Sequence, residues 1–145
     1  ALSFLKDPQL GATALRVEAG QAAIRAFIDN PGECRFLQSI KSFAASPLFQ
    51  GTFVHGRKFQ FEDLMEVFLK RLEHYAGDNW PSPLKRVVTG RPVHFAGPNP
   101  DPALAMRRYN EAMTRPGSPE LHYAYEPVAA AVASAPLLRP FSRDR

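Results

Sequence analysis

Cysteine and long apolar runs are the features that this sequence has least of. Its 145 residues contain a single cysteine, Cys34, which excludes a disulfide within the chain and a CxxC pair of metal ligands. No apolar run approaches the roughly 20 residues that a membrane-spanning helix needs. A chain without disulfides is typical of a reducing compartment. We therefore expect a cytoplasmic protein that does not associate with membranes.

Common catalytic and metal-binding signatures are also missing. There is no Walker-type glycine-rich loop and no Gly-x-Ser-x-Gly turn, and the four histidines lack the HxxxH spacing of a metal site. The net charge is +4, from 18 Lys and Arg against 14 Asp and Glu. These basic residues do not cluster with aromatic residues as they would in a nucleic-acid binder. Nucleic acid is therefore not the expected partner.

What the sequence does contain is proline and phenylalanine. The 14 prolines, about twice the usual share, divide the chain into short elements, and the 11 phenylalanines supply much of a core. Residues 1–15 show no periodic pattern and are expected to be irregular. Helical spacing of apolar residues predicts helices at 21–29, 33–45 and 62–76. Between the last two, residues 52–54 and 57–61 flank a His-Gly turn and predict a hairpin.

Strand and helix signals alternate in the C-terminal half. The apolar run around residues 87–88 predicts a buried strand, a helix follows the cap at Asp101, and residues 121–125 predict a second strand. Two strands joined by a helix should be parallel. Ligands of such sheets bind at the carboxyl ends of the strands, where Pro92 and Glu126 lie. By position alone, Pro92 would be a strand terminator and Glu126 a helix cap.

Two short motifs lie at these strand ends, Arg91-Pro-Val-His-Phe95 and Tyr125-Glu-Pro-Val-Ala-Ala-Ala131. They resemble the Val-Pro-Ala-Tyr-Phe and Asn-Glu-Pro-Thr-Ala-Ala-Ala segments in the ATPase domain of the DnaK-type (seventy-kilodalton heat-shock) chaperones, and the substitutions suit the YegD-like branch. The resemblance covers about residues 18–135. It implies an α/β fold, namely part of an actin-like ATPase (ribonuclease H-like) domain.

The resemblance also implies a division of the chain. Residues 1–84 would form a mostly helical lobe with a short hairpin, similar to the inserted subdomain IB of the family. Residues 85–135 would supply a parallel strand–helix–strand unit and a further helix of subdomain IA. Residues 136–145 would be a tail outside the likeness.

Site residues follow from the resemblance and not from spacing. A lone lysine on a helix is usually solvated, but Lys41 matches a family lysine that reaches the γ-phosphate of ATP. Glu126 matches a catalytic glutamate near the nucleotide's Mg²⁺, which it contacts through water. Pro92 matches a proline that switches between nucleotide states, and Arg107 or Arg108 would be the arginine that relays the switch. ATP, Mg²⁺, unfolded client proteins and co-chaperones are the implied cofactors and partners.

The family's two phosphate-binding loops have no counterpart in the sequence. We therefore expect a fragment of a chaperone ATPase that does not hydrolyse ATP by itself, although its full-length parent would. Unpaired strand edges in such a fragment would favour self-association. Two alternatives remain open: a small α/β protein-interaction module that needs no nucleotide, and a basic nucleic-acid binder.

Overall fold

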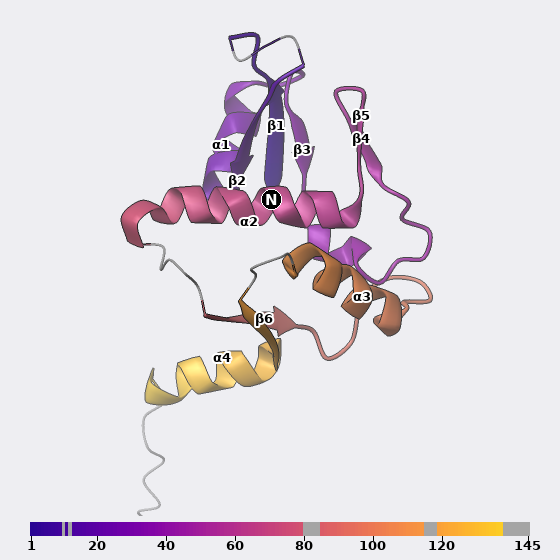
Figure 1. The fold of residues 1–145 in the computed structure, drawn as a ribbon, viewed down its shortest axis with the longest axis vertical. Coiled ribbons are helices and arrows are strands. Elements are labelled where there is room, and N and C mark those ends of the chain that lie inside the picture. Colours follow the sequence, from indigo (N-terminus) through magenta and orange to yellow (C-terminus); the bar gives the residue numbers. More distant parts are fainter. Residues whose placement is uncertain (10, 12, 80–84, 115–118, 138–145) are drawn as a thin grey trace, which may run out of the picture.

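The first strand of the chain lies at the centre of a three-stranded antiparallel sheet (Figure 1). The computed structural model describes residues 1–9, 11, 13–79, 85–114 and 119–137. In the sheet, β1 (Leu2–Lys6) pairs with β2 (Leu15–Ala19) on one side and with β3 (Arg35–Leu37) on the other. The helix α1 (Gly20–Asp29) lies against this sheet and connects β2 to β3.

Both faces of β1 are covered. Phe4 contacts Phe59 of the hairpin on one face, with 5.2 Å between ring centroids. On the opposite face Phe36 of β3 stacks on Phe27 of α1 at 4.8 Å, so α1 covers that side. Leu2, Ser3, Phe4 and Leu5 are all buried in consequence. The expectation that residues 1–15 are irregular was wrong, because a strand buried on both faces need not alternate apolar with polar residues.

The helix expected at residues 33–45 is also absent. Its first part is the strand β3, in which Leu37 pairs with Leu2. Its second part is a single 3₁₀ turn at Ile40–Phe43. Ser39 separates the two with a φ of 52°, a left-handed conformation that no helix continues through. Pairing with β1 has therefore overridden a helical pattern, and the N-terminal lobe is not mostly helical.

The hairpin and the long helix agree with the sequence. The hairpin consists of β4 (Thr52–Val54) and β5 (Arg57–Phe59), and α2 (Phe61–Ala76) follows at once. A capping box begins α2, since the backbone N–H of Gln60 donates to the carboxylate of Asp63 at 2.8 Å. Gly77, with a φ of 51°, ends it. Further 3₁₀ turns lie at Gly77–Asn79 and Ala135–Leu137.

A hydrogen-bonded cluster ties α2 to β2. The guanidinium of Arg71 donates to the Glu18 carboxylate at 2.6 Å, and the Tyr75 hydroxyl donates to the same oxygen. Burial alone would raise the pKa of Glu18, but the hydrogen bonds from Tyr75 and Arg71 lower it below its usual value. The Tyr75 hydroxyl also accepts from the backbone N–H of Ala19 at 3.1 Å. These contacts fix the angle at which α2 crosses the sheet (Figure 1).

The C-terminal half forms the expected strand–helix–strand unit. The strands β6 (Arg86–Arg91) and β7 (Glu120–Tyr125) pair in parallel, α3 (Pro102–Met113) joins them, and α4 (Glu126–Ser134) follows β7 directly. Asp101 caps α3 by accepting from the backbone N–H of Leu104 at 2.9 Å. The fold is thus of mixed α/β class. The boundary expected at residue 84 and most of the tail expected at 136–145 lie outside the described residues.

One core joins the two halves. Buried side chains from the first sheet, the hairpin and the N-terminal end of α2 meet the inner face of α3, where Tyr109 packs edge-on against Phe61 with 5.5 Å between ring centroids. Within the described ranges, no helix is long and apolar enough to cross a membrane.

Candidate functional site

Lys41 and Glu126 form an ion pair between the two halves of the molecule. Lys41 belongs to the 3₁₀ turn that follows β3, and Glu126 is the first residue of α4. The ammonium Nζ donates to the carboxylate Oε1, although 85 residues separate the two in sequence. The side chains are 60% and 41% exposed, so water screens the pair and it contributes at most about 1 kcal/mol to stability. The ion pair of Lys41 and Glu126 is therefore considered for its chemistry and not for its contribution to stability.

Gly90 makes room for the Glu126 carboxylate. A Cβ at Gly90 would lie 3.0 Å from Cγ and 3.4 Å from Oε1 of Glu126. Gly90 pairs with Ala124 across the parallel strands, so the Glu126 side chain folds back over the carboxyl end of β6. The register of the two strands and the missing side chain at residue 90 together aim the carboxylate at Lys41.

Pro92 lies directly after β6, at the same end of the sheet. The preceding Arg91 places its guanidinium over the ring of Tyr125, 5.0 Å from the centroid. This contact holds the ends of β6 and β7 together. Pro92 itself is partly buried, and three residues later Phe95 is buried in the core. The carboxyl ends of the two strands, where the sequence placed Pro92 and Glu126, are thus neighbours, as parallel pairing requires.

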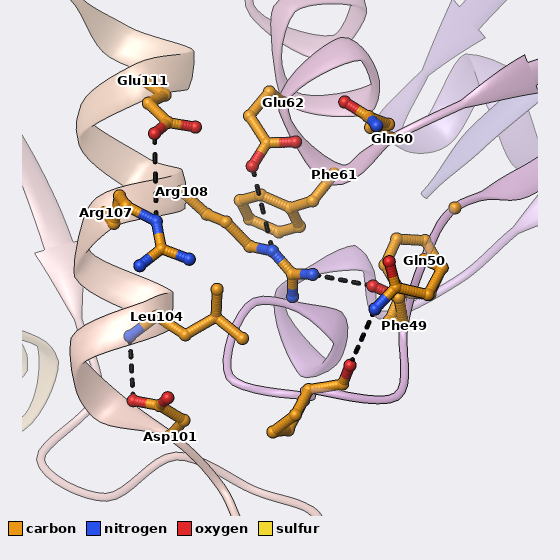
Figure 2. Close-up of a pocket in the computed structure, with 12 residues that line it drawn as sticks. Phe49, Gln50, Gln60, Phe61, Glu62, Asp101, Leu104, Arg107, Arg108 and Glu111 are labelled. Atoms are coloured by element: carbon orange, nitrogen blue, oxygen red, sulfur yellow. Dashed lines mark hydrogen bonds and ion pairs between the residues drawn. The ribbon is translucent and has the colours of Figure 1, made fainter.

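Arg108 is a structural tie between α3 and the loop that follows Lys41. One guanidinium nitrogen, Nη1, donates to the carbonyl oxygens of Phe43, Ala44 and Ser46 at 2.8, 3.0 and 3.0 Å. The other, Nη2, donates to the carbonyl of Phe49 at 2.7 Å (Figure 2). The side chain is only 11% exposed. With both terminal nitrogens engaged in this way, Arg108 holds the loop in place.

Arg107 behaves differently from its neighbour. Its side chain is 65% exposed and approaches Glu111, one helical turn further along α3, at 3.9 Å. Both residues line a pocket of about 370 Å³ between α3, the start of α2 and the loop at residues 47–51 (Figure 2). Neither Lys41 nor Glu126 lines this pocket. Of the two arginines proposed for a relay, only Arg108 contacts the segment that carries Lys41.

A second hollow adjoins the ion pair. Lys41 lines it together with Ile40, Met65 and Phe68, and its volume is about 390 Å³. Most of these side chains are apolar. Lys41 therefore lies between an apolar hollow in the N-terminal lobe and the carboxyl end of the parallel strands.

Tyr109 of α3 is a buried tyrosine that the sequence analysis did not single out. Its ring is 2% exposed, and its hydroxyl is buried without a hydrogen-bond partner among the described residues. Burial raises the pKa of Tyr109 from 10.0 to about 12, and the nearby Glu126 and Tyr123 act in the same direction. Burial also raises the pKa of Tyr123, with Arg91 opposing it. The only sequence signal was a tyrosine among the apolar residues on the inner face of a helix, directly after a pair of arginines.

A complete metal site is not formed by this part of the chain. In residues 1–9, 11, 13–79, 85–114 and 119–137, no group of three or more His, Cys, Asp and Glu side chains is arranged to hold a metal ion. Glu126 offers one carboxylate. This fits a contact with Mg²⁺ through water, because Mg²⁺ keeps several of its own waters in proteins. A single carboxylate cannot bind the ion without further ligands.

Known families offer no independent assignment. No protein-family model matches the chain. The functional interpretation therefore rests on the geometry of Lys41 and Glu126 and on the two motifs at the strand ends.

Proposed function

We propose that this chain is part of the ATPase domain of a DnaK-type, YegD-like chaperone with an actin-like fold. In the whole protein, ATP hydrolysis would drive cycles of client binding and folding with co-chaperones in the cytoplasm. The observation that carries the proposal is the ion pair of Lys41 with Glu126. Both residues were selected on the sequence by one resemblance, and a lysine and a glutamate chosen 85 positions apart without such a basis would seldom touch.

The pair has the chemistry that phosphoryl transfer needs. When bound, ATP supplies the phosphoryl group and Mg²⁺ neutralises part of its charge. An ammonium has three N–H donors, so Lys41 can bind Glu126 and still donate to a phosphate oxygen. Glu126 accepts from Lys41 through Oε1, which leaves Oε2 to orient a water molecule. Its position in the first turn of α4 stabilises the carboxylate, because the N-terminal end of a helix is electropositive.

The exposed surface of the parallel strands supports a larger domain. Val88 of β6 is 62% exposed, and Val128 and Val132 of α4 are 58% and 68% exposed. Parallel sheets are normally covered on both faces. In the proposed ATPase, further segments of the domain would cover these residues. The chain alone would then lack the phosphate loops, and we expect it not to hydrolyse ATP.

The same exposed surface favours a second candidate, a protein-interaction module that uses this face without nucleotide. Under that alternative the uncovered valines would meet a partner protein. Self-association of the isolated chain, measured by light scattering, is expected under both proposals. Nucleotide binding separates them.

The test is calorimetric titration with ATP and Mg²⁺ of this chain and of its full-length parent. We expect binding by the parent only. In the parent, Lys41→Met and Glu126→Gln should each lower kcat on the order of 100-fold, the usual effect of removing one preorganised charged group. Lys70→Met is the matched control, since Lys70 is equally exposed and pairs with Glu66 at 2.7 Å on α2. A parent that fails to bind ATP, or equal effects at Lys41 and Lys70, would refute the ATPase proposal.

A further inference from the structure

A basic hollow lies at the end of β1 opposite to Lys41, on the part of the first sheet that is directed away from α3 and α4 (Figure 1). Its volume is about 600 Å³, within the range of pockets that hold small-molecule ligands. The described residues that line it are Lys6, Thr13, Leu15, His55, Gly56 and Arg57, and none of them is acidic. The hollow beside Lys41 is lined by Ala1 instead. The two hollows therefore lie at opposite ends of the same strand.

Strand pairing places Lys6 and the hairpin on the same side of the sheet. Lys6 pairs with Leu15 and follows Phe4 by two residues, so its side chain points to the same face as Phe4. On that face Phe4 contacts Phe59 of the hairpin. The guanidinium of Arg57 lies over the Phe59 ring, 5.2 Å from its centroid, which restrains it. The sheet and the hairpin thus hold Lys6 and Arg57 around one hollow.

His55 fixes the tip of the hairpin against β1. His55 and Gly56 form the turn with φ values of 48° and 83°, and type I′ hairpin turns need such positive values at both positions. The ring nitrogen Nε2 lies 3.0 Å from the carbonyl oxygen of Phe4. Because a carbonyl oxygen can only accept, Nε2 carries the hydrogen of this bond. The wall of the hollow that carries Arg57 is therefore anchored to β1.

The two cations of the basic hollow have no anionic partner in the described part of the protein. Neither Lys6 nor Arg57 takes part in an ion pair with another described residue. The pocket between α2 and α3 differs in this respect, since its arginines are paired with glutamates. Positive charges gathered around a hollow produce a potential that attracts anions. The hydroxyl of Thr13 adds a neutral donor to the same wall.

We propose that the basic hollow binds the phosphate group of a small molecule. A phosphate ester carries a charge of about −1.5 to −2 near pH 7, which matches the two unpaired cations. The planar guanidinium of Arg57 can donate to two phosphate oxygens at once. Lys6 and Thr13 can donate to the remaining oxygens from β1 and from the loop before β2. The volume of the hollow leaves room for the rest of the ligand.

NMR titration of the full chain with inorganic phosphate, near pH 7 and at constant ionic strength, tests the site without Mg²⁺ or nucleotide. We expect saturable shifts of the backbone amide signals of Thr13, Gly56 and Arg57, and weaker binding of succinate, whose carboxylates are planar. Glycerol phosphate should bind at least as tightly as inorganic phosphate. Shifts that do not saturate, or equal affinity for succinate, overturn the proposal. A phosphoserine peptide that binds more tightly than glycerol phosphate contradicts a small-molecule ligand.

Variants show whether the two cations act specifically. Lys6→Met and Arg57→Met should each weaken phosphate binding about fivefold to tenfold, between the effect of an exposed ion pair and that of a hydrogen bond to a charged group. Lys58→Met is the matched control, since Lys58 follows Arg57 in β5, points to the opposite face and does not line the hollow. An equal loss in Lys58→Met overturns the proposal.

The outcome is independent of the ATPase proposal. Lys41→Met should leave phosphate binding unchanged, because Lys41 lies at the other end of β1. Phosphate binding that is lost in Lys41→Met and retained in Lys6→Met would place the anion at the ion pair and overturn the assignment of the basic hollow. If Arg57→Met does not fold, Lys6→Met still decides, since Lys6 is an exposed residue at the end of a strand.

Discussion

Replacing Arg108 with methionine should destabilise the fold far more than the same change at Arg107. Methionine keeps the length of the side chain and removes every donor. The carbonyls of Phe43 and Ser46 each keep a backbone donor, from Ser46 at 3.2 Å and from Phe49 at 3.2 Å. The carbonyls of Ala44 and Phe49 lose the hydrogen bond that Arg108 gives them.

The magnitude follows from those two carbonyls. Leaving a buried acceptor unpaired costs about 1–3 kcal/mol, so the pair would cost about 2–6 kcal/mol. Ala44 is fully buried, and water cannot reach it without local opening. Phe49 is only partly buried, so its carbonyl can be hydrated. We therefore expect Arg108→Met to lower the free energy of unfolding by about 2–4 kcal/mol. Arg107→Met removes an exposed pair worth at most about 0.5 kcal/mol.

Urea denaturation measures both variants, read as the shift in midpoint at an unchanged slope. Arg108→Lys should fall between wild type and methionine, since a single ammonium cannot reach as many carbonyls as a guanidinium fork. The expectation is contradicted if Arg108→Met loses less than about 1 kcal/mol, the least that one unpaired buried acceptor should cost, or if Arg107→Met loses as much. In that case the loop at residues 43–49 would hold its shape without Arg108.

Three further predictions concern single positions. Gly90→Ala should change stability little, because the Glu126 side chain can move away, but it should break the ion pair of Glu126, detected as a shift of its carboxyl signal. Tyr109 should make stability fall between pH 10 and about 12, since the unfolded chain deprotonates first; the loss is at most about 3 kcal/mol, and Tyr109→Phe should abolish it in alkaline denaturation curves. Glu18 has a lowered pKa in the fold, so its contribution is present above pH 4.5 and lost as the pH falls below it. Glu18→Gln should flatten the acid side of the stability profile, and an unchanged acid limb would contradict this assignment.

The helices with complete local signals were the ones that the sequence predicted well. Residues 62–76 combine an apolar stripe with acids in the first turn, and α2 (Phe61–Ala76) matches them within one residue. Asp101 followed by proline predicted the start of α3, which begins at Pro102. In both cases the information lies within one or two turns of chain, so tertiary contacts did not need to be known.

The strands of the first sheet were missed for the opposite reason. β1 is buried on both faces and therefore has no period of two. The apolar residues of β3 and the following turn, Phe36, Leu37 and Ile40, have spacing that also suits a helix. The pairing of Leu37 with Leu2, which are 35 residues apart, is what makes this segment a strand. Local pattern cannot express such a contact.

The site divides in the same way. Parallel strands place Pro92 and Glu126 at one end by a general rule, and that part needed no family. Lys41 came from the resemblance alone, since nothing in its own neighbourhood distinguishes it from a solvated lysine. Gly90 was not singled out, because the room that it leaves matters only once the Glu126 side chain has been placed against it.

The helix α3 contacts both halves of the molecule, the loop at residues 43–49 through Arg108 and the strand β7 through Asn110. Arg108 fixes the backbone of residues 43–49 through four carbonyls, and this segment begins in the 3₁₀ turn that carries Lys41. Tyr109, the next residue, is turned into the core and packs against Phe61. Consecutive residues of α3 thus bind the loop after Lys41 and pack into the core. Arg108 contacts this loop and the exposed Arg107 does not, so the relay that the resemblance implies for one of these two arginines would fall to Arg108.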